Sequence, residues 1–165
     1  MDVGDIVEDF ELADDQGVTR SLTGLLADGP VVLFFYPAAL STGCTAEACH
    51  FRDITTELKA VGGQPVGISG DTVERQAEFA TRHRLGYPLL SDPDGVVRAQ
   101  FGVKRGLLGL TAAARITFVI DTDRRILAGH CAIRNRRSAF PVRRSAACAA
   151  PRRPCRRGRP SGSRS

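Results

Sequence analysis

The chain has 165 residues, 42% of them hydrophobic and 25% charged, which is the composition of an ordinary globular protein. No stretch approaches the roughly 18 uninterrupted apolar residues of a membrane span, and the acidic N-terminus lacks the layout of a signal peptide, so we expect a cytoplasmic protein. The net charge is +5, and five cysteines in a chain without an export signal favour reactive or incidental thiols over a framework of disulfides.

Up to about residue 129, short apolar runs alternate with amphipathic stretches, a pattern typical of βαβ units. Residues 10–12 and 18–21 flank Asp14, Asp15 and Gly17, which predicts an N-terminal β-hairpin. The run 31–36 is continuously apolar and rich in β-branched and aromatic residues. Such a run is typical of a strand covered on both faces, so we place it at the centre of a sheet.

A helix is predicted directly after this strand, from about residue 44 to 61. Gly62 and Gly63 end this segment. Its apolar residues recur at helical spacing, namely Ala48, Phe51, Thr55, Leu58 and Val61.

The next segments continue the alternation of strands and helices. We predict a strand at 64–69 and a helix that Asp71 or Thr72 caps and that runs to about His83, with Val73, Ala77 and Ala80 on one face. Residues 87–90 are expected to be extended, and the turn at 92–95 leads into a brief helix. Strands at 116–120 and 126–128 are expected to form a hairpin, whereas 106–114 is a loop or weak helix.

The charge is divided between two unlike pieces. Residues 1–129 hold 12 Lys and Arg against 18 acids, a net charge of −6, whereas residues 130–165 hold 11 Arg and no acid. The second piece has few large apolar side chains, so we predict a domain at 1–129 and a disordered basic tail at 130–165. Out-of-frame reading of a GC-rich gene explains the tail's composition better than a genuine nucleic-acid-binding arm does, although both interpretations stay open.

The informative chemistry lies where the central strand meets its helix. Cys44 falls in the first helical turn, where unpaired backbone N–H groups and the positive end of the helix dipole favour a thiolate. The alternative is a small buried hydrophobe that happens to be cysteine. The strand-to-helix junction and the flanking Ser41, Thr42 and Gly43 favour a reactive thiol.

Cys49 lies five positions after Cys44, and helix geometry tests whether the two can bond. Their Cα atoms would lie roughly 8.6 Å apart in an intact helix, beyond the ~7 Å limit for a disulfide. If they are partners, the first turns must unwind, which indicates an enzyme that cycles between two local conformations. This spacing argues against a Cys-x-x-Cys exchange site, and no zinc-ligand spacing occurs in residues 1–129.

The residues around Cys44 resemble the peroxiredoxins, in particular the bacterioferritin-comigratory or PrxQ subgroup. The family pattern is Pro-x-x-x-Thr-x-x-Cys, often Thr-Pro-Gly-Cys-Thr-x-Glu-x-Cys in this subgroup. The chain matches it at Pro37, Gly43, Cys44, Thr45, Glu47 and Cys49. Further likeness at 49–53, 66–69, 87–92, 101–103 and 115–121 extends the resemblance from about residue 3 to 127.

The resemblance implies an α/β, thioredoxin-like fold in which helices flank a central mixed sheet. It also implies thiol-dependent reduction of hydrogen peroxide and organic hydroperoxides without a metal or organic cofactor. Cys44 would be the peroxidatic cysteine, and Cys49 the resolving cysteine that forms a disulfide with it. A thioredoxin-type protein would reduce this disulfide, and we expect a monomer or weak homodimer.

The resemblance also assigns roles around the thiol. Arg115 would stabilise the thiolate and polarise the departing oxygen, while Pro37 shields the site. The Ser41 hydroxyl would bond thiolate and peroxide, and the backbone N–H groups of Gly43 and Cys44 would hold substrate oxygens.

Three positions in this motif leave alternatives open. Ser41 replaces the family threonine and lacks the methyl group that restricts χ1, which predicts slower turnover. Thr42 replaces the common proline, which eases unwinding. Glu47 is a candidate for tuning Arg115, although acids in a first helical turn also occur for dipole reasons alone.

The main rival function is a catalytically impaired relative with a holdase or tail-dependent nucleic-acid-binding role.

Overall fold

A five-stranded mixed β-sheet organises the protein, with its strands in the order β5-β4-β3-β6-β7. The computed structural model describes residues 1–103 and 115–131, without the side chains of His130 and Cys131. The elements in chain order are β1 (Glu11–Ala13), β2 (Thr19–Ser21), α1 (Leu22–Leu26), β3 (Val31–Phe35), α2 (Thr42–Asp53), α3 (Thr55–Ala60), β4 (Gln64–Ser69), α4 (Val73–His83), β5 (Leu89–Ser91), α5 (Val96–Gln100), β6 (Ile116–Ile120) and β7 (Ile126–Cys131).

The apolar strand β3 occupies the centre of the sheet, as its sequence predicts. It pairs in parallel with β4, where Val31 faces Gln64, and antiparallel with β6, where Phe35 faces Ile116. Strand β6 in turn forms the predicted antiparallel pair with β7. The carboxyl end of β3 therefore lies beside the carboxyl end of β4 and the amino end of β6.

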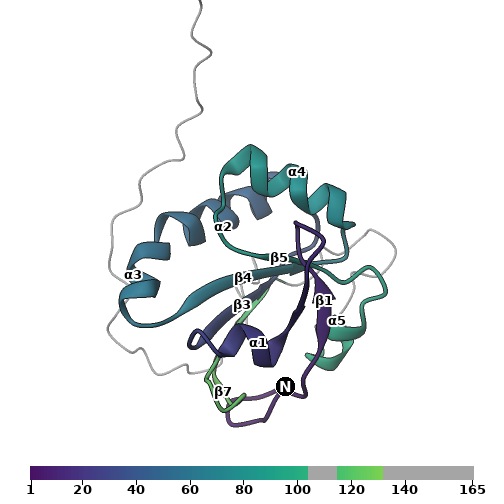
Figure 1. The fold of residues 1–165 in the computed structure, drawn as a ribbon. Helices are drawn as coiled ribbons and strands as arrows, with labels where there is room; N and C mark the ends of the chain where they lie inside the picture. Colours follow the sequence, from purple (N-terminus) through teal and green to yellow (C-terminus); the bar gives the residue numbers. More distant parts are fainter. Residues whose placement is uncertain (104–114, 132–165) are drawn as a thin grey trace, which may run out of the picture. The chain divides into compact units, whose positions relative to one another are not determined.

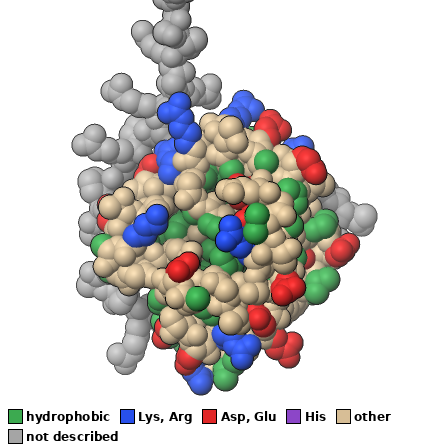
Figure 2. Space-filling view, viewed as in Figure 1, with side chains coloured by type: hydrophobic (Ala, Val, Ile, Leu, Met, Phe, Trp, Pro, Cys, Tyr) green, Lys and Arg blue, Asp and Glu red, His purple; other side chains and the backbone are tan. Residues whose placement is uncertain are grey.

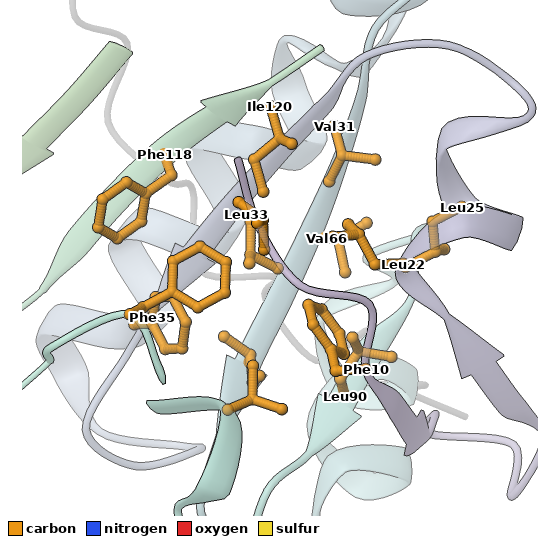
Figure 3. Packing of buried hydrophobic residues seen from close by; sticks show 14 of the residues in the cluster. Phe10, Leu22, Leu25, Val31, Leu33, Phe35, Val66, Leu90, Phe118 and Ile120 are labelled. Atoms are coloured by element: carbon orange, nitrogen blue, oxygen red, sulfur yellow. The ribbon is translucent and has the colours of Figure 1, made fainter. Parts of the chain in front are cut away.

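Two hydrophobic clusters cover the two faces of this sheet, because successive side chains of β3 point to opposite sides. Helices α2, α3 and α4 lie on one face, and α1 and α5 lie on the other (Figure 1). Leu33 and Phe35 belong to the cluster on the α1 and α5 side, part of which is drawn in Figure 3. Phe34 and Tyr36 belong to the cluster beneath α2 and α4.

The helix expected over 44–61 is instead two helices, and this prediction was wrong in its continuity. Helix α2 ends at Asp53, and Ile54 has φ −101° and ψ 7° before α3 begins at Thr55. A β-branched run follows Asp53, and the Thr55 hydroxyl donates to the Phe51 carbonyl at 2.8 Å, which bends helices. Val61, expected on the buried face, is 77% exposed.

The end of α3 follows the predicted glycine signal. The N–H of Gly63 donates to the Leu58 carbonyl at 2.8 Å, and the N–H of Gly62 donates to the Lys59 carbonyl at 3.0 Å. These two bonds make a Schellman motif, and Gly62 supplies its left-handed residue with φ +78°.

Other boundaries differ from the sequence pattern by small amounts. Helix α4 ends at His83 as predicted, but its fully buried residues are Gln76 and Phe79, while the expected apolar face is half-buried. The five-residue helix α1, which Ser21 caps, was not predicted. Strand β7, predicted at 126–128, continues to Cys131 and so passes the predicted domain boundary at 129. The remainder of the proposed tail, and the loop or weak helix at 106–114, lie outside the described residues.

Candidate active site

The site lies where β3 ends and α2 begins. Tyr36 continues the strand, since its N–H donates to the Ile68 carbonyl at 3.1 Å. The chain then turns, with Leu40 in the left-handed region at φ 64°, and Ser41 is the extended N-cap of α2. Cys44 is consequently in the first turn of α2, as predicted, where the N–H groups have no acceptor within the helix.

Arg115 reaches the Cys44 thiol from the neighbouring strand. Its side chain is placed there because β6 begins beside the carboxyl end of β3, with Ile116 opposite Phe35. Arg115 Nη2 lies 3.7 Å from Cys44 Sγ, and the thiol is buried, with 1% of Cys44 exposed. A fixed positive charge therefore lies against a thiol withdrawn from solvent.

Gly43 provides the space in which the guanidinium lies. A Cβ atom added at Gly43 would collide with the Nη2, Cζ and Nη1 atoms of Arg115. Helix position alone disfavours glycine, so close approach is the physical reason for glycine here.

Glu47 faces the same guanidinium one turn after Cys44. Its Oε2 lies 3.6 Å from Arg115 Nε, and neither buried atom has a hydrogen-bond partner. Burial raises the pKa of the Glu47 carboxyl, while the Arg115 charge partly opposes this rise. The structure thus brings Cys44, Arg115 and Glu47 together in one cluster.

Ser41 and Pro37 lie in the loop before this cluster. The Ser41 hydroxyl donates to the Ala38 carbonyl at 3.1 Å, so the bond to the thiol that the family resemblance implies is not present in this conformation. Pro37 follows Tyr36 and is half-buried.

Cys49 lies in the same unbroken helix as Cys44. Cys44 and Cys49 are not joined by a disulfide, and Cys49 is 3% exposed. The helix is continuous between them, so their Cα atoms are held roughly 8.6 Å apart by helix geometry. A bond between these thiols requires the first turns of α2 to unwind.

The second half of α2 is tied to the body of the protein by contacts that sequence reasoning did not find. The Tyr87 hydroxyl donates to the Ala48 carbonyl at 2.8 Å, and Arg52 Nη1 donates to the His83 carbonyl at 2.9 Å. The Phe51 ring stacks on Phe34 with 4.4 Å between centroids. Unwinding from the N-terminus therefore meets increasing resistance near Cys49.

Three further properties of the described residues bear on the site. Within residues 1–103 and 115–131, no group of three or more His, Cys, Asp or Glu side chains could hold a metal ion. Across these same ranges, every helix is too short or too polar to cross a membrane. Basic and acidic side chains are interspersed over the face drawn in Figure 2.

A thioredoxin-like sheet that presents a buried cysteine at a helix start, against an arginine, defines the class of thiol-dependent peroxidases. The AhpC/TSA family pattern matches residues 3–128, and the chain belongs to this family as a peroxiredoxin. A Mycobacterium tuberculosis protein named as a peroxiredoxin is 62% identical to this chain over 128 residues, which cover 77% of this chain and 83% of the relative. Peroxiredoxin Bcp of Escherichia coli is 40% identical over 130 residues, covering 76% and 83%.

Solved structures agree with this assignment. The crystal structure of peroxidoxin BcpB from Mycobacterium tuberculosis superposes with a TM-score of 0.75 at 60% identity, covering 79% of this chain and 86% of that one. A Xylella fastidiosa PrxQ variant has a TM-score of 0.74 at 22% identity, covering 81% and 87%, and supports the fold alone.

Proposed function

We propose that Cys44 is the peroxidatic cysteine and that Cys49 resolves its oxidised form. The observation that carries this assignment is the 3.7 Å approach of Arg115 Nη2 to the buried Cys44 Sγ. In the first step the Cys44 thiolate attacks one peroxide oxygen, so that an S–O bond forms as the O–O bond breaks. The departing oxygen leaves as hydroxide or alkoxide and takes up a proton, while sulfur becomes a sulfenic acid.

The roles of the residues around Cys44 follow from the negative charge that passes from the thiolate to the departing oxygen in this step. The Arg115 guanidinium stabilises the thiolate and then the negative charge on the departing oxygen. The N–H groups of Gly43 and Cys44 hold peroxide oxygens, and the Ser41 hydroxyl turns from Ala38 to the substrate. Pro37 shields the thiol, and Glu47 fixes the orientation of Arg115.

The second step returns the sulfenic acid to a reducible state. The first turns of α2 unwind, and the Cys49 thiolate attacks the Cys44 sulfur. An S–S bond forms, the S–O bond breaks, and the oxygen leaves as water after protonation. A dithiol reductant of the thioredoxin type then reduces the disulfide and restores both thiols. We further propose that the protein acts in the cytoplasm as a monomer or weak homodimer.

Thiol counting tests this function. Reduced protein mixed with one equivalent of hydrogen peroxide, quenched with an alkylating agent and digested, is expected to lose the Cys44 and Cys49 thiols together. Cys44→Ser abolishes the loss, whereas Cys49→Ser leaves Cys44 oxidised without a disulfide. Unchanged thiols at both positions in the wild-type protein would refute the proposal.

A further inference from the structure

A buried polar network lies behind the loop that precedes Cys44. The Tyr36 hydroxyl donates to Gln76 Oε1, and Gln76 Nε2 donates to Ser69 Oγ at 3.0 Å and to the Leu90 carbonyl at 2.9 Å. Ser69 Oγ in turn donates to Asp71 Oδ2 at 2.8 Å. Tyr36, Gln76 and Ser69 are fully or almost fully buried, so these bonds form in a low-dielectric interior where a lost partner is costly.

The network ends on the active-site loop. The backbone N–H of Ala39 donates to Asp71 Oδ2 at 2.6 Å, a short bond to a charged acceptor. Asp71 reaches this loop because it follows β4, and the carboxyl ends of the parallel strands β3 and β4 adjoin. The Ser91 hydroxyl holds the Asp71 backbone carbonyl at 2.7 Å, so the anchor itself is fixed.

The loop needs such an anchor. Leu40, adjacent to Ala39, has φ 64°, a conformation that costs a non-glycine residue about 1–3 kcal/mol and persists only where the surroundings enforce it. Leu40 is followed by Ser41, the N-cap that sets where α2 begins and where the Cys44 N–H group points. The Ser41 side chain accepts no capping hydrogen bond from the N–H groups of α2, so the loop holds the start of the helix.

We propose that Asp71 is a positioning residue for the peroxidase reaction. It holds the Ala39 N–H, and through the strained Leu40 it fixes the geometry of Ser41 and Cys44 in the folded site. The inference rests on the proposed role of Cys44. Because disulfide formation needs the first turns of α2 to unwind, loss of this anchor slows oxidation of Cys44 but does not slow the subsequent step.

Four variants of the full chain separate position from charge. Asp71→Ala removes the acceptor, Asp71→Asn keeps an oxygen acceptor without the charge, and Asp71→Glu keeps the charge but moves the carboxylate. Arg75→Gln is the matched control, because Arg75 Nε contacts the other carboxylate oxygen, Oδ1, at 3.1 Å and is half exposed. Rapid quenching with an alkylating agent, followed by peptide mass spectrometry, measures each step.

We expect Asp71→Ala and Asp71→Glu to lower the second-order rate constant of Cys44 oxidation by about 10- to 100-fold, as expected for a misplaced reacting group. Asp71→Asn should stay within about 3-fold of wild type, since a neutral hydrogen bond of the same geometry remains. Arg75→Gln should match wild type. In every variant the first-order rate of Cys44–Cys49 disulfide formation should equal or exceed the wild-type rate.

The inference is overturned if Asp71→Ala and Asp71→Glu oxidise at the wild-type rate, or if both steps slow equally. Faster oxidation in Asp71→Asn would also overturn it, because the carboxylate would then act as a charge that opposes the thiolate. If Asp71→Ala does not fold, the rate constants of Cys44 oxidation in Asp71→Glu and Asp71→Asn still decide whether Asp71 positions the loop. Failure of wild-type Cys44 to react with peroxide would refute the proposed function instead.

Discussion

Arg115 links the two acidic groups of the site, since its Nη2 faces the Cys44 thiol and its Nε faces Glu47. Arg115→Ala should lower the rate constant of Cys44 oxidation by about 100-fold, the usual loss for a group that stabilises developing negative charge. Arg115→Lys keeps a positive charge, but an ammonium group cannot contact Cys44 and Glu47 at once as the planar guanidinium does. The rate constant of this variant should therefore lie between those of Arg115→Ala and the wild type.

Peroxide competition against a reference peroxidase measures these rate constants. Arg82→Ala is the control, because Arg82 is an exposed arginine in an ion pair with Glu78 on α4. Equal rates in Arg115→Ala and Arg82→Ala would show that the approach to the thiol has no part in the reaction.

Gly43 gives a prediction in which stability and activity separate. Gly43→Ala should raise helix propensity by up to about 1 kcal/mol, but its methyl group displaces the Arg115 guanidinium. We therefore expect Cys44 oxidation to slow by about 10-fold while the urea midpoint stays level or rises. Ala46→Gly, an exposed change in the same turn, should lower the midpoint without slowing oxidation. A fast Gly43→Ala variant would mean that Arg115 acts from elsewhere.

Glu47 should impose a pH dependence on stability. Burial raises the pKa of its carboxyl in the folded state above the ordinary value of 4.5, so the unfolded chain ionises first as pH rises. This contribution is fully present below pH 4.5 and is lost as pH rises through the folded pKa. Glu47→Gln should remove that loss, giving a flatter profile of unfolding free energy above pH 4.5. Urea titrations at a series of pH values test this, and parallel profiles would contradict it.

At the scale of elements, the start of α2 controls the change between the two steps. Ser41 has ψ 145°, which is compatible with a following proline, and Thr42 is the first helical residue, where proline is favoured. Thr42→Pro should stabilise the folded turn by about 0.4–1 kcal/mol and slow Cys44–Cys49 disulfide formation by about 2- to 5-fold. Quenched mass spectrometry at saturating peroxide isolates this step.

Val73→Pro is the matched control for Thr42→Pro. It places proline at the first residue of α4, whose N-cap Thr72 is also extended, with ψ 163°. Helix α4 contains no cysteine, so disulfide formation should keep its wild-type rate. A slower disulfide step in both variants would mean that general rigidity, rather than the first turn of α2, sets the rate.

Elements with a strong local pattern were predictable from sequence, and weak ones were not. The spans of β4 and β6 and the end of α4 follow the predicted bounds, and β3 ends one residue before its apolar run does. The five-residue α1 is too short to show a clear period, and the break at Ile54 arises from a side-chain hydrogen bond that a periodicity analysis does not include.

The residues of the site likewise differ in how far the sequence predicts them. Cys44 and its helix start follow from local spacing, whereas Arg115, 71 positions later, was assigned through the family resemblance. Asp71 and Tyr87 were not predicted as parts of the site, because their contacts with the loop and with α2 arise only when the sheet assembles.

At the scale of the whole molecule, the sheet separates two hydrophobic clusters. The cluster beneath α2 and α4 supports the site, and the cluster on the α1 and α5 side does not. Phe34 contacts Phe51 of α2 and Tyr87, whereas Leu33 packs into the opposite cluster with Phe35. Phe34→Leu and Leu33→Val each delete buried volume in the same strand, and each should lower the unfolding free energy by about 1–3 kcal/mol.

The two variants should differ in activity although they are similarly destabilised. Phe34→Leu removes the ring on which α2 rests, so oxidation of Cys44 per folded molecule should slow by about 3- to 10-fold as the first turn shifts. Leu33→Val should keep the wild-type rate, because the sheet lies between it and α2. Urea unfolding gives the folded fraction, and quenched alkylation gives the rate. If both variants slow in proportion to their lost stability, the two faces are not independent, and global stability controls the reactivity of Cys44.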